Sequence, residues 1–214
     1  MPGARLADRA AAGRALGEEL QRRGIGADGG IVLGIPRGGV VTAAEVAGVL
    51  GLPFDVALAR KVGAPGNREL AVGAVGPDGT AVIDEVLARR VGATEPWLAQ
   101  AVDVERREVT DREQRFRGDR PPLDVAGRVV VVVDDGVATG STATAVGRWL
   151  SGAGASRRVL AVPVAPPQTA EQMAATYDDV VVLATPAHFF AVGEFYVDFR
   201  QVTDDEVREV LATP

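Results

Sequence analysis

Four short segments of this chain are apolar at nearly every position, and they limit the possible folds more than any other feature. The purest is a run of five valines at residues 129–133, and segments 31–35, 159–164 and 180–183 are similar. A strand that is apolar on both sides must be covered on both sides, as happens in a parallel sheet flanked by helices. Because helical segments separate these runs, we predict an α/β fold with a doubly wound, mainly parallel sheet.

Local signals predict the remaining elements. Asp8 is a candidate N-cap and Gly24 a candidate stop for a first helix, in which Ala12, Leu16 and Leu20 share one face. Further helices are expected at residues 40–50, 95–117 and 204–211, in a segment that ends near residue 150, and after residue 167. A further strand is expected at residues 54–59, and a hairpin from residues 71–75 and 80–83. In the charged helix at residues 95–117, the favourable pairs four residues apart are Glu108 with Arg112, Asp111 with Arg115, and Glu113 with Arg117.

Composition excludes several classes of site. The 214 residues can bury one substantial core, and they include no cysteine, so disulfides, thiolate catalysis and cysteine-ligated metals are excluded. His188 is the single histidine, which argues against a Ser/His/Asp triad or a multi-histidine metal site. A net charge of -6 disfavours nucleic acid as a partner. The sequence has no apolar run of membrane-spanning or signal-peptide type, so we expect a cytoplasmic protein without membrane attachment.

The segment after the five valines carries the strongest chemical signal. Asp134 and Asp135 stand at the carboxyl end of a predicted buried strand, the edge at which open α/β sheets bind ligands. Backbone N–H groups of residues 138–142, with the hydroxyls of that loop, can surround a phosphate at a helix start. Two carboxylates next to an anion site can accept hydrogen bonds from the hydroxyls of a sugar, or they can bind a cation such as Mg²⁺. The alternative is that the acids merely end a strand and that Ser141 or Thr142 caps a helix.

This stretch resembles the phosphoribosyl pyrophosphate (PRPP) motif of type I phosphoribosyltransferases. The resemblance implies that Asp134 and Asp135 contact the ribose hydroxyls and orient the ring, with Mg²⁺ held nearby through PRPP. It also implies that the ribose 5-phosphate is bound by the acidic pair and by the loop that follows it, namely Gly136, Val137, Ala138, Thr139, Gly140, Ser141 and Thr142.

A second segment, Pro36-Arg37-Gly38-Gly39, resembles the pyrophosphate loop of the same family. There the glycines let backbone N–H groups approach the diphosphate, and Arg37 adds positive charge. The family often has a cis peptide at this point, so we predict one between Pro36 and Arg37. The bland alternative is a simple turn that starts a helix.

A third segment fits the basic pair that reaches the pyrophosphate in this family. Arg60 and Lys61 are the matching residues, and Lys61 joins Asp134 and Asp135 as a candidate catalytic residue. An exposed strand end is the alternative for both residues, and it fits Arg60 better than Lys61. The sequences RKVGAPGN and VDDGVATG are similar to those of a group of small predicted phosphoribosyltransferases.

The resemblance implies a single domain over residues 1–214 with two additions. Residues 60–120 form an insertion made of a mobile loop, a hairpin and a long helix, and residues 186–200 form a small hood. The loop at 62–70 resembles the family's mobile catalytic loop, with Glu69 as a candidate for proton transfer or loop closure. In the hood, Phe190, Phe195 and Tyr196 are candidates to stack on the acceptor, although such rings more often belong to a core.

The function implied by the resemblance is Mg²⁺-dependent transfer of a 5-phosphoribosyl group from PRPP to an unidentified nitrogenous acceptor in nucleotide metabolism, with release of pyrophosphate. Relatives that act on 6-oxopurines carry an aspartate where this chain has Ala138, so hypoxanthine and guanine are disfavoured acceptors. The alternative is a noncatalytic sensor of PRPP or a nucleotide with the same fold. Similar proteins are often homodimers, so a second copy of the chain is a candidate partner.

Overall fold

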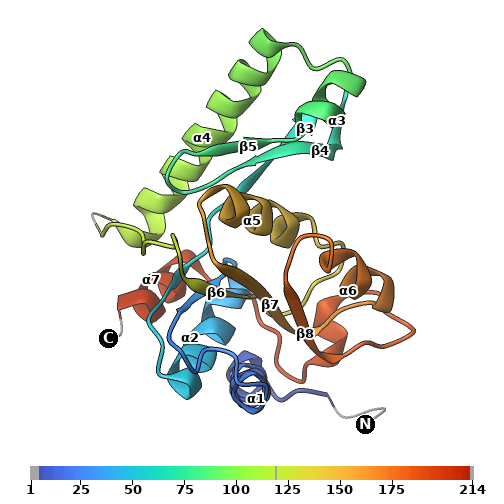
Figure 1. Ribbon diagram of the computed structural model, residues 1–214. Coiled ribbons are helices and arrows are strands. Elements are labelled where there is room, and N and C mark those ends of the chain that lie inside the picture. Colours follow the sequence, from blue (N-terminus) through green and yellow to red (C-terminus); the bar gives the residue numbers. More distant parts are fainter. Residues whose placement is uncertain (1–4, 119, 213–214) are drawn as a thin grey trace.

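A five-stranded parallel sheet forms the centre of the structure, a computed structural model that describes residues 5–118 and 120–212. The strand order is β2 (Phe54–Val56), β1 (Ile31–Gly34), β6 (Val129–Val133), β7 (Arg157–Val164) and β8 (Asp179–Ala184) (Figure 1). The chain runs from β1 outward to β2, then returns to β6 and continues in the opposite direction. The point where the order reverses, between β1 and β6, is where such sheets bind ligands.

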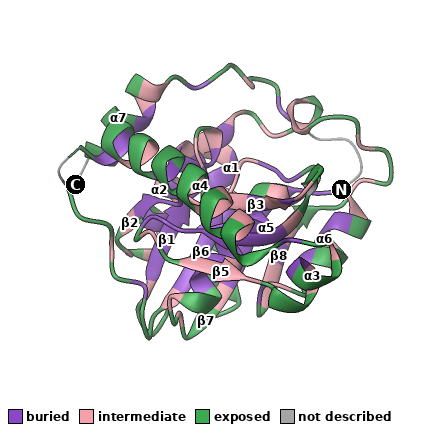
Figure 2. Ribbon diagram, turned by 90° about the horizontal axis from the view of Figure 1, so that it is seen from above, coloured by how far each residue is buried: buried purple, intermediate pink, exposed green. Residues whose placement is uncertain are grey.

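The five valines of β6 explain why helices cover both faces of this sheet. Val130 and Val132 pack into one apolar cluster, and Val131 and Val133 pack into another. The first cluster includes apolar side chains of α5 (Ser141–Gly152) and α6 (Pro167–Met173), and the second includes side chains of α1 (Arg9–Arg22) and α2 (Gly38–Leu50). Buried residues accordingly concentrate in the central strands (Figure 2). The predicted doubly wound α/β fold is confirmed.

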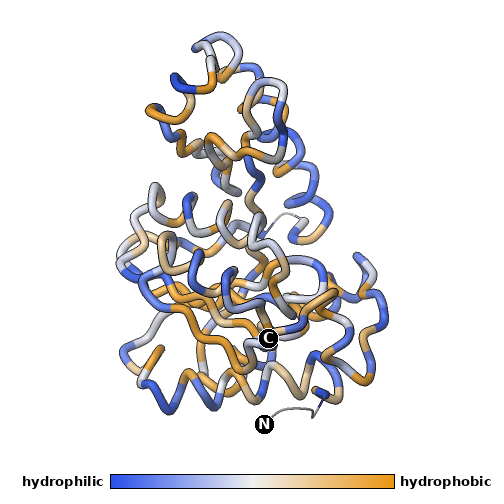
Figure 3. The backbone as a smooth tube through the Cα atoms, turned by 90° about the vertical axis from the view of Figure 1, so that its right-hand side faces the viewer, coloured by the Kyte–Doolittle hydropathy of each residue, from blue (hydrophilic) through white to orange (hydrophobic). Residues whose placement is uncertain are grey.

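A smaller unit stands above the main body (Figures 1 and 3). It contains an antiparallel sheet of β3 (Arg60–Ala64), β4 (Asn67–Val75) and β5 (Ala81–Ile83), together with α3 (Glu85–Arg90) and α4 (Glu95–Arg117). The unit rests on α5, where the indole nitrogen of Trp149 donates to Asp78 at 3.1 Å and Arg148 donates to the carbonyl of Ala71 at 3.0 Å. Helix α5 therefore contacts both sheets.

One expectation for the small unit is wrong. Residues 60–70 were expected to be an irregular loop, but they form β3 and the start of β4, joined by a tight turn at Gly66 with φ +71°. The reason is that Val62 and Ala64 alternate with more exposed positions and are buried to 0% and 3% exposure, which is a strand pattern. Glycine and proline within the segment hide that pattern. Strand β2 is also shorter than expected: it ends at Val56, whereas the expected strand reached residue 59.

Helix boundaries follow the expectations closely. Asp8 caps α1 by accepting a hydrogen bond from the backbone of Ala11 at 2.7 Å, and α4 covers the whole predicted segment. The chain ends in the expected helix, α7 (Asp204–Ala212), while residues 186–200 contain only a short 3-10 helix, η1 (Val192–Phe195). No helix within residues 5–118 and 120–212 is long and apolar enough to cross a membrane.

The carboxyl end of α4 is fixed to the main sheet by a buried ion pair. Arg117 donates to Asp55 of β2 at 2.8 Å and to the carbonyl of Val56 at 3.0 Å, with only 3% of its side chain exposed. Of the three predicted pairs along α4, the described residues include the one between Glu113 and Arg117, whereas Arg115 instead reaches Asp204 of α7 at 3.4 Å. The long charged helix is therefore tied to the core at one end.

We predict that Arg117→Met destabilises the protein by about 3–5 kcal/mol, because it leaves the carboxylate of Asp55 buried without its partner. The matched control is Arg115→Met on the same helix, whose exposed ion pair contributes about 0–1 kcal/mol. Urea unfolding of the two variants and the wild type measures both effects. Equal stability of the two variants would show that the buried pair does not anchor α4.

Candidate active site

Two loops meet at the reversal point of the sheet. Strand β1 pairs with β6 so that Gly34 lies opposite Val133, and the backbone N–H of Ile35 donates to the carbonyl of Val133 at 2.8 Å. The Pro36 turn and the acidic pair consequently leave the same edge side by side. The structure has the predicted cis peptide between Pro36 and Arg37.

Glycine at positions 38 and 39, the first two residues of α2, permits the start of this helix to lie directly against the acids. A Cβ placed on Gly38 would lie 1.9 Å from Oδ2 of Asp135, and one on Gly39 would lie 2.8 Å from both the Cα and Oδ1 of Asp134. No side chain fits in that space. The two glycines that the sequence assigned to an anion-binding turn thus also form the contact between the turn and the acidic pair.

Asp135 is held from two sides. Its carboxylate accepts a hydrogen bond from Nε of Arg9 at 2.7 Å, and its carbonyl accepts one from the hydroxyl of Tyr196 at 2.5 Å. Arg9 also donates to the carbonyl of Arg200 at 2.8 Å and lies 3.9 Å from the ring centroid of Phe199. The N-terminal helix and the segment after η1 therefore cooperate in fixing one acid.

Sequence reasoning missed Arg9, although a signal was present. Arg9 shares a helical face with Ala12, Leu16 and Leu20, and an arginine on an apolar face needs a buried partner. The side chains of Arg9 and Asp135 are only 10% and 14% exposed. What the sequence did not reveal was that this partner lies 126 residues away.

Asp134 differs from its neighbour in its electrostatic environment. Burial, and then the negative charge of Asp135, raise the pKa of Asp134 well above its usual range, while a hydrogen bond from the backbone N–H of Asp135 at 2.8 Å and the charge of Arg9 act in the opposite direction. The two acids are therefore not equivalent, because Asp135 has an arginine partner and Asp134 has only a backbone donor.

The loop after the acids leads into a helix that lacks a side-chain cap. Gly140 is the N-cap of α5 with φ +74°, and within residues 5–118 and 120–212 this helix has no side-chain cap hydrogen bond. The alternative reading, in which Ser141 or Thr142 caps this helix, is therefore not realised. Ala138, Thr139 and Thr142 are exposed. Free N–H groups and the positive end of the helix dipole can bind an anion here.

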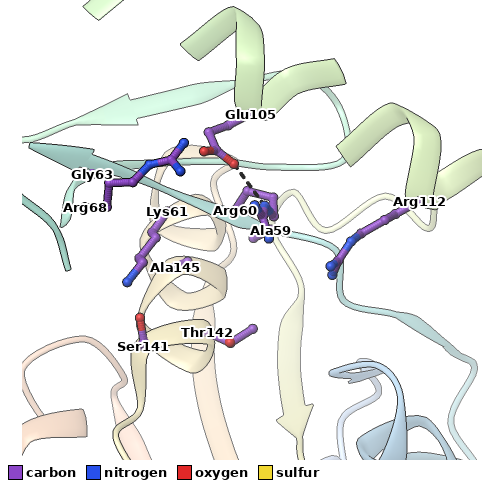
Figure 4. A pocket seen from close by; sticks show the side chains of 10 residues that line it. All are labelled: Ala59, Arg60, Lys61, Gly63, Arg68, Glu105, Arg112, Ser141, Thr142 and Ala145. Carbon is purple, nitrogen blue, oxygen red and sulfur yellow. Dashed lines mark hydrogen bonds and ion pairs between the residues drawn. The ribbon is translucent and has the colours of Figure 1, made fainter. Parts of the chain in front are cut away.

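A cavity of about 310 Å³ lies between β3, α4 and the start of α5 (Figure 4). Four cationic side chains line it, together with one acid, which pairs with Arg60 at 2.9 Å. These charged residues are Arg60, Lys61, Arg68, Arg112 and Glu105. A smaller cavity of about 70 Å³ shares four lining residues with it and extends to Pro36. The cavities thus connect the Pro36 turn with Ser141 and Thr142, and their lining is suited to anions.

The other predicted site residues, within the described part of the chain, do not line these two cavities. Arg37 lies near Asp204 at 3.7 Å, and the acidic pair is not among the residues that line these two cavities. Of the candidate stacking rings, Tyr196 is buried, Phe195 stacks on Phe189 with centroids 5.3 Å apart, and Phe190 is 84% exposed. The side chain of Glu69 lies outside the described residues. Arg68 and Arg112 are cavity residues that the sequence did not indicate.

Known proteins resemble this chain over most of its length. The family model of the phosphoribosyl transferase domain matches residues 7–200. A Mycobacterium tuberculosis protein, provisionally named a phosphoribosyl transferase, is 44% identical over 204 residues; the match covers 94% of this chain and 45% of that protein. The crystal structure of TT1426 from Thermus thermophilus has a TM-score of 0.90 and 44% identity, and the match covers 97% of each chain. This chain thus spans about half the length of the mycobacterial relative.

We predict that Asp134→Asn raises the melting temperature at neutral pH. Because the folded-state pKa of Asp134 is raised, the native state holds its proton more tightly than the unfolded chain does. Its contribution to stability is complete below the unfolded pKa of about 3.9 and is lost as the pH rises through the folded pKa. The asparagine removes that loss, and each gain of about 1 kcal/mol corresponds to roughly 2–4 °C.

Differential scanning calorimetry of both proteins from pH 4 to pH 8 tests this sign. The difference in melting temperature should grow as the pH rises and shrink toward the acid end. A variant that melts below the wild type at neutral pH, or a difference that does not change with pH, would contradict the assignment.

Proposed function

The chain belongs to the phosphoribosyl transferase family, and we propose that it transfers the 5-phosphoribosyl group of PRPP to a nitrogenous acceptor, with release of pyrophosphate. The observation that carries this proposal is the direct contact of Gly38 and Gly39, at the start of α2, with the acidic pair. That contact lies beside an uncapped helix start and near a cationic cavity. A sugar with phosphates at both ends matches this order of groups.

The ribose 5-phosphate would lie on the loop from Gly136 to Thr142. Backbone N–H groups at the start of α5 donate to its oxygens, and the hydroxyls of Thr139, Ser141 and Thr142 add further donors. Asp134 and Asp135 accept hydrogen bonds from the ribose hydroxyls and so set the orientation of the ring. Arg9 supports this role, because it fixes the carboxylate of Asp135 at 2.7 Å.

The pyrophosphate would lie on the opposite side of the ring, on the turn from Pro36 to Gly39. Arg37 supplies charge there, and Arg60 and Lys61 approach from β3. These cations stabilise the negative charge that grows on the leaving group. We propose Lys61 as the catalytic cation, because its ammonium group lines the cavity next to Ser141 (Figure 4). The hairpin of β3 and β4 would close over the substrate and exclude water.

Mg²⁺ fits this site only as an ion that the substrate brings with it. Among residues 5–118 and 120–212, no group of three or more His, Cys, Asp or Glu side chains could hold a metal. Two carboxylates, one of them paired with Arg9, suit an ion that takes most of its oxygen ligands from the diphosphate and from water. When bound, Mg²⁺ would neutralise charge on the diphosphate.

The reaction breaks the bond between C1′ and the pyrophosphate oxygen, and the pyrophosphate leaves with the electron pair. A nitrogen lone pair of the acceptor forms the new bond to C1′ from the opposite face, and the proton that this nitrogen carried leaves to solvent. The ring gains positive character between these events, which the charge of the acidic pair favours. The contribution of the protein is therefore orientation and electrostatic stabilisation.

The acceptor would approach from the side of Ala138. Because alanine cannot exchange a proton with a 6-oxopurine, an adenine-like, pyrimidine or non-nucleobase acceptor fits better than hypoxanthine or guanine. Of the three predicted stacking rings, Phe190 is the remaining candidate, since its side chain is exposed while Tyr196 is buried. Nucleotide metabolism and a cytoplasmic location are consistent with these substrates.

The competing function is a noncatalytic sensor of PRPP. It would hold the ribose with the same two acids, with Asp135 fixed by Arg9 as in the enzyme. The cationic lining that includes Lys61 favours the enzyme. Turnover distinguishes the two functions.

We predict that the wild type binds PRPP in a Mg²⁺-dependent manner and that Asp134→Asn weakens this binding about tenfold or more, because a ribose-accepting carboxylate is lost. Isothermal titration calorimetry with and without Mg²⁺ measures the affinity. Asp134 is a better target than Asp135, whose removal would leave Arg9 unpaired and confuse binding with folding. The control is Asp111→Asn, an exposed acid on α4.

Pyrophosphate release against a panel of adenine, pyrimidines and small amines then tests catalysis. Hypoxanthine and guanine should give no release. Tight PRPP binding without release on any acceptor would replace the enzyme by the sensor, and absence of PRPP binding to the wild type would overturn both.

A further inference from the structure

Arg112 occupies a position on α4 that the functions assigned so far do not use. It lines both the larger cavity and the smaller one, and Arg60, Thr142 and Ala59 are the other residues that the two cavities share. It therefore stands where the space beside the start of α5 continues to the Pro36 turn. The side chain extends from α4 toward the side of the cavity on which Thr142 lies (Figure 4).

The side chain lies on the face of α4 that packs against the rest of the protein. Val109, three residues earlier, and Phe116, four residues later, share that face and are 2% and 6% exposed. Arg107 and Thr110 are exposed. Arg112 itself is half-buried, and a partner for its charge offsets the loss of water around the guanidinium.

That partner is not part of the described chain. Among residues 5–118 and 120–212, Arg112 has no hydrogen bond and no ion pair. The predicted pair with Glu108 is absent, although neighbouring arginines are engaged: Arg115 with Asp204, and Arg117 with Asp55. Arg60, across the cavity, pairs with Glu105. The side chain of Arg112 lines both cavities.

We propose that Arg112 is a further pyrophosphate-binding residue, supplied by α4 to the site; this inference rests on the proposed function. Arginine presents a planar set of N–H donors that matches two phosphate oxygens at once. Of the residues around the smaller cavity, Pro36 and Arg60 belong to the proposed pyrophosphate group, and only Thr142 belongs to the phosphate loop. This arrangement assigns Arg112 to the pyrophosphate rather than to the 5-phosphate.

The position of Arg112 is set in advance by the packing of the helix. Arg117, five residues later, fixes the end of α4 to β2 through Asp55 and the carbonyl of Val56. A donor on such a rigid element loses little freedom when it binds a ligand. The small unit thus contributes to the site from two elements, β3 and α4.

The test is Arg112→Met, titrated calorimetrically with PRPP, with pyrophosphate and with ribose 5-phosphate, all with Mg²⁺. We expect the affinity for PRPP and pyrophosphate to fall about tenfold or more, because charge-assisted hydrogen bonds are lost, and the affinity for ribose 5-phosphate to stay within about twofold. Arg112→Lys should recover part of the loss, since it restores charge without the planar donor set. Arg107→Met, on the exposed face of the same helix, is the matched control.

The results test the role of Arg112, its assignment to the pyrophosphate and the proposed function separately. Unchanged PRPP and pyrophosphate affinity in Arg112→Met overturns the role of Arg112 while leaving the proposed function intact. An equal loss for ribose 5-phosphate overturns its assignment to the pyrophosphate. Failure of the wild type to bind any of the three ligands overturns the proposed function and this inference together. A melting temperature of Arg112→Met close to that of the wild type excludes unfolding as the cause of a loss.

Discussion

The close packing of Gly38 and Gly39, at the start of α2, on Asp134 and Asp135 is the contact on which the rest of the candidate site depends. It exists because β1 and β6 are neighbours with parallel direction, so that the loops after both strands leave one edge. It also requires that neither glycine carries a Cβ, since such an atom would overlap the acids. The strand order places the two loops side by side, and the absence of side chains at Gly38 and Gly39 lets them pack closely.

The same packing brings two negatively charged side chains close together, and the fold supplies a cationic partner for one of them. Two adjacent carboxylates are brought under a turn, and burial raises the pKa of Asp134. Arg9 compensates one of these charges at 2.7 Å, from an element more than a hundred residues away in the sequence. For Asp134, the cost in folding free energy remains. A stability cost that persists in a candidate binding site is typical of residues retained for binding rather than for folding.

Much of the fold was predictable from the sequence because its core obeys simple rules. The valines of β6 must be covered on both sides, and the expected N-cap at Asp8 marks the start of α1 correctly. The hairpin at β3 was missed because glycine and proline dominate its appearance, although Val62 and Ala64 are buried. Arg9 and Arg112 were missed for a different reason. Their environment is set by distant parts of the chain, whereas rules for helices consider neighbours four residues away.

The case of Arg112 shows how tertiary structure can reverse a local interpretation. On an isolated helix, Glu108 and Arg112 would form a favourable surface pair worth about 0.2–0.5 kcal/mol, and the helix would be read as solvated. Anchoring of α4 through Arg117 turns one face of that helix toward α5 and the Pro36 turn. A side chain on that face then lines the cavities between the Pro36 turn and the start of α5. The cationic character of the cavity, in a chain with net charge -6, therefore arises from how two units pack and not from composition.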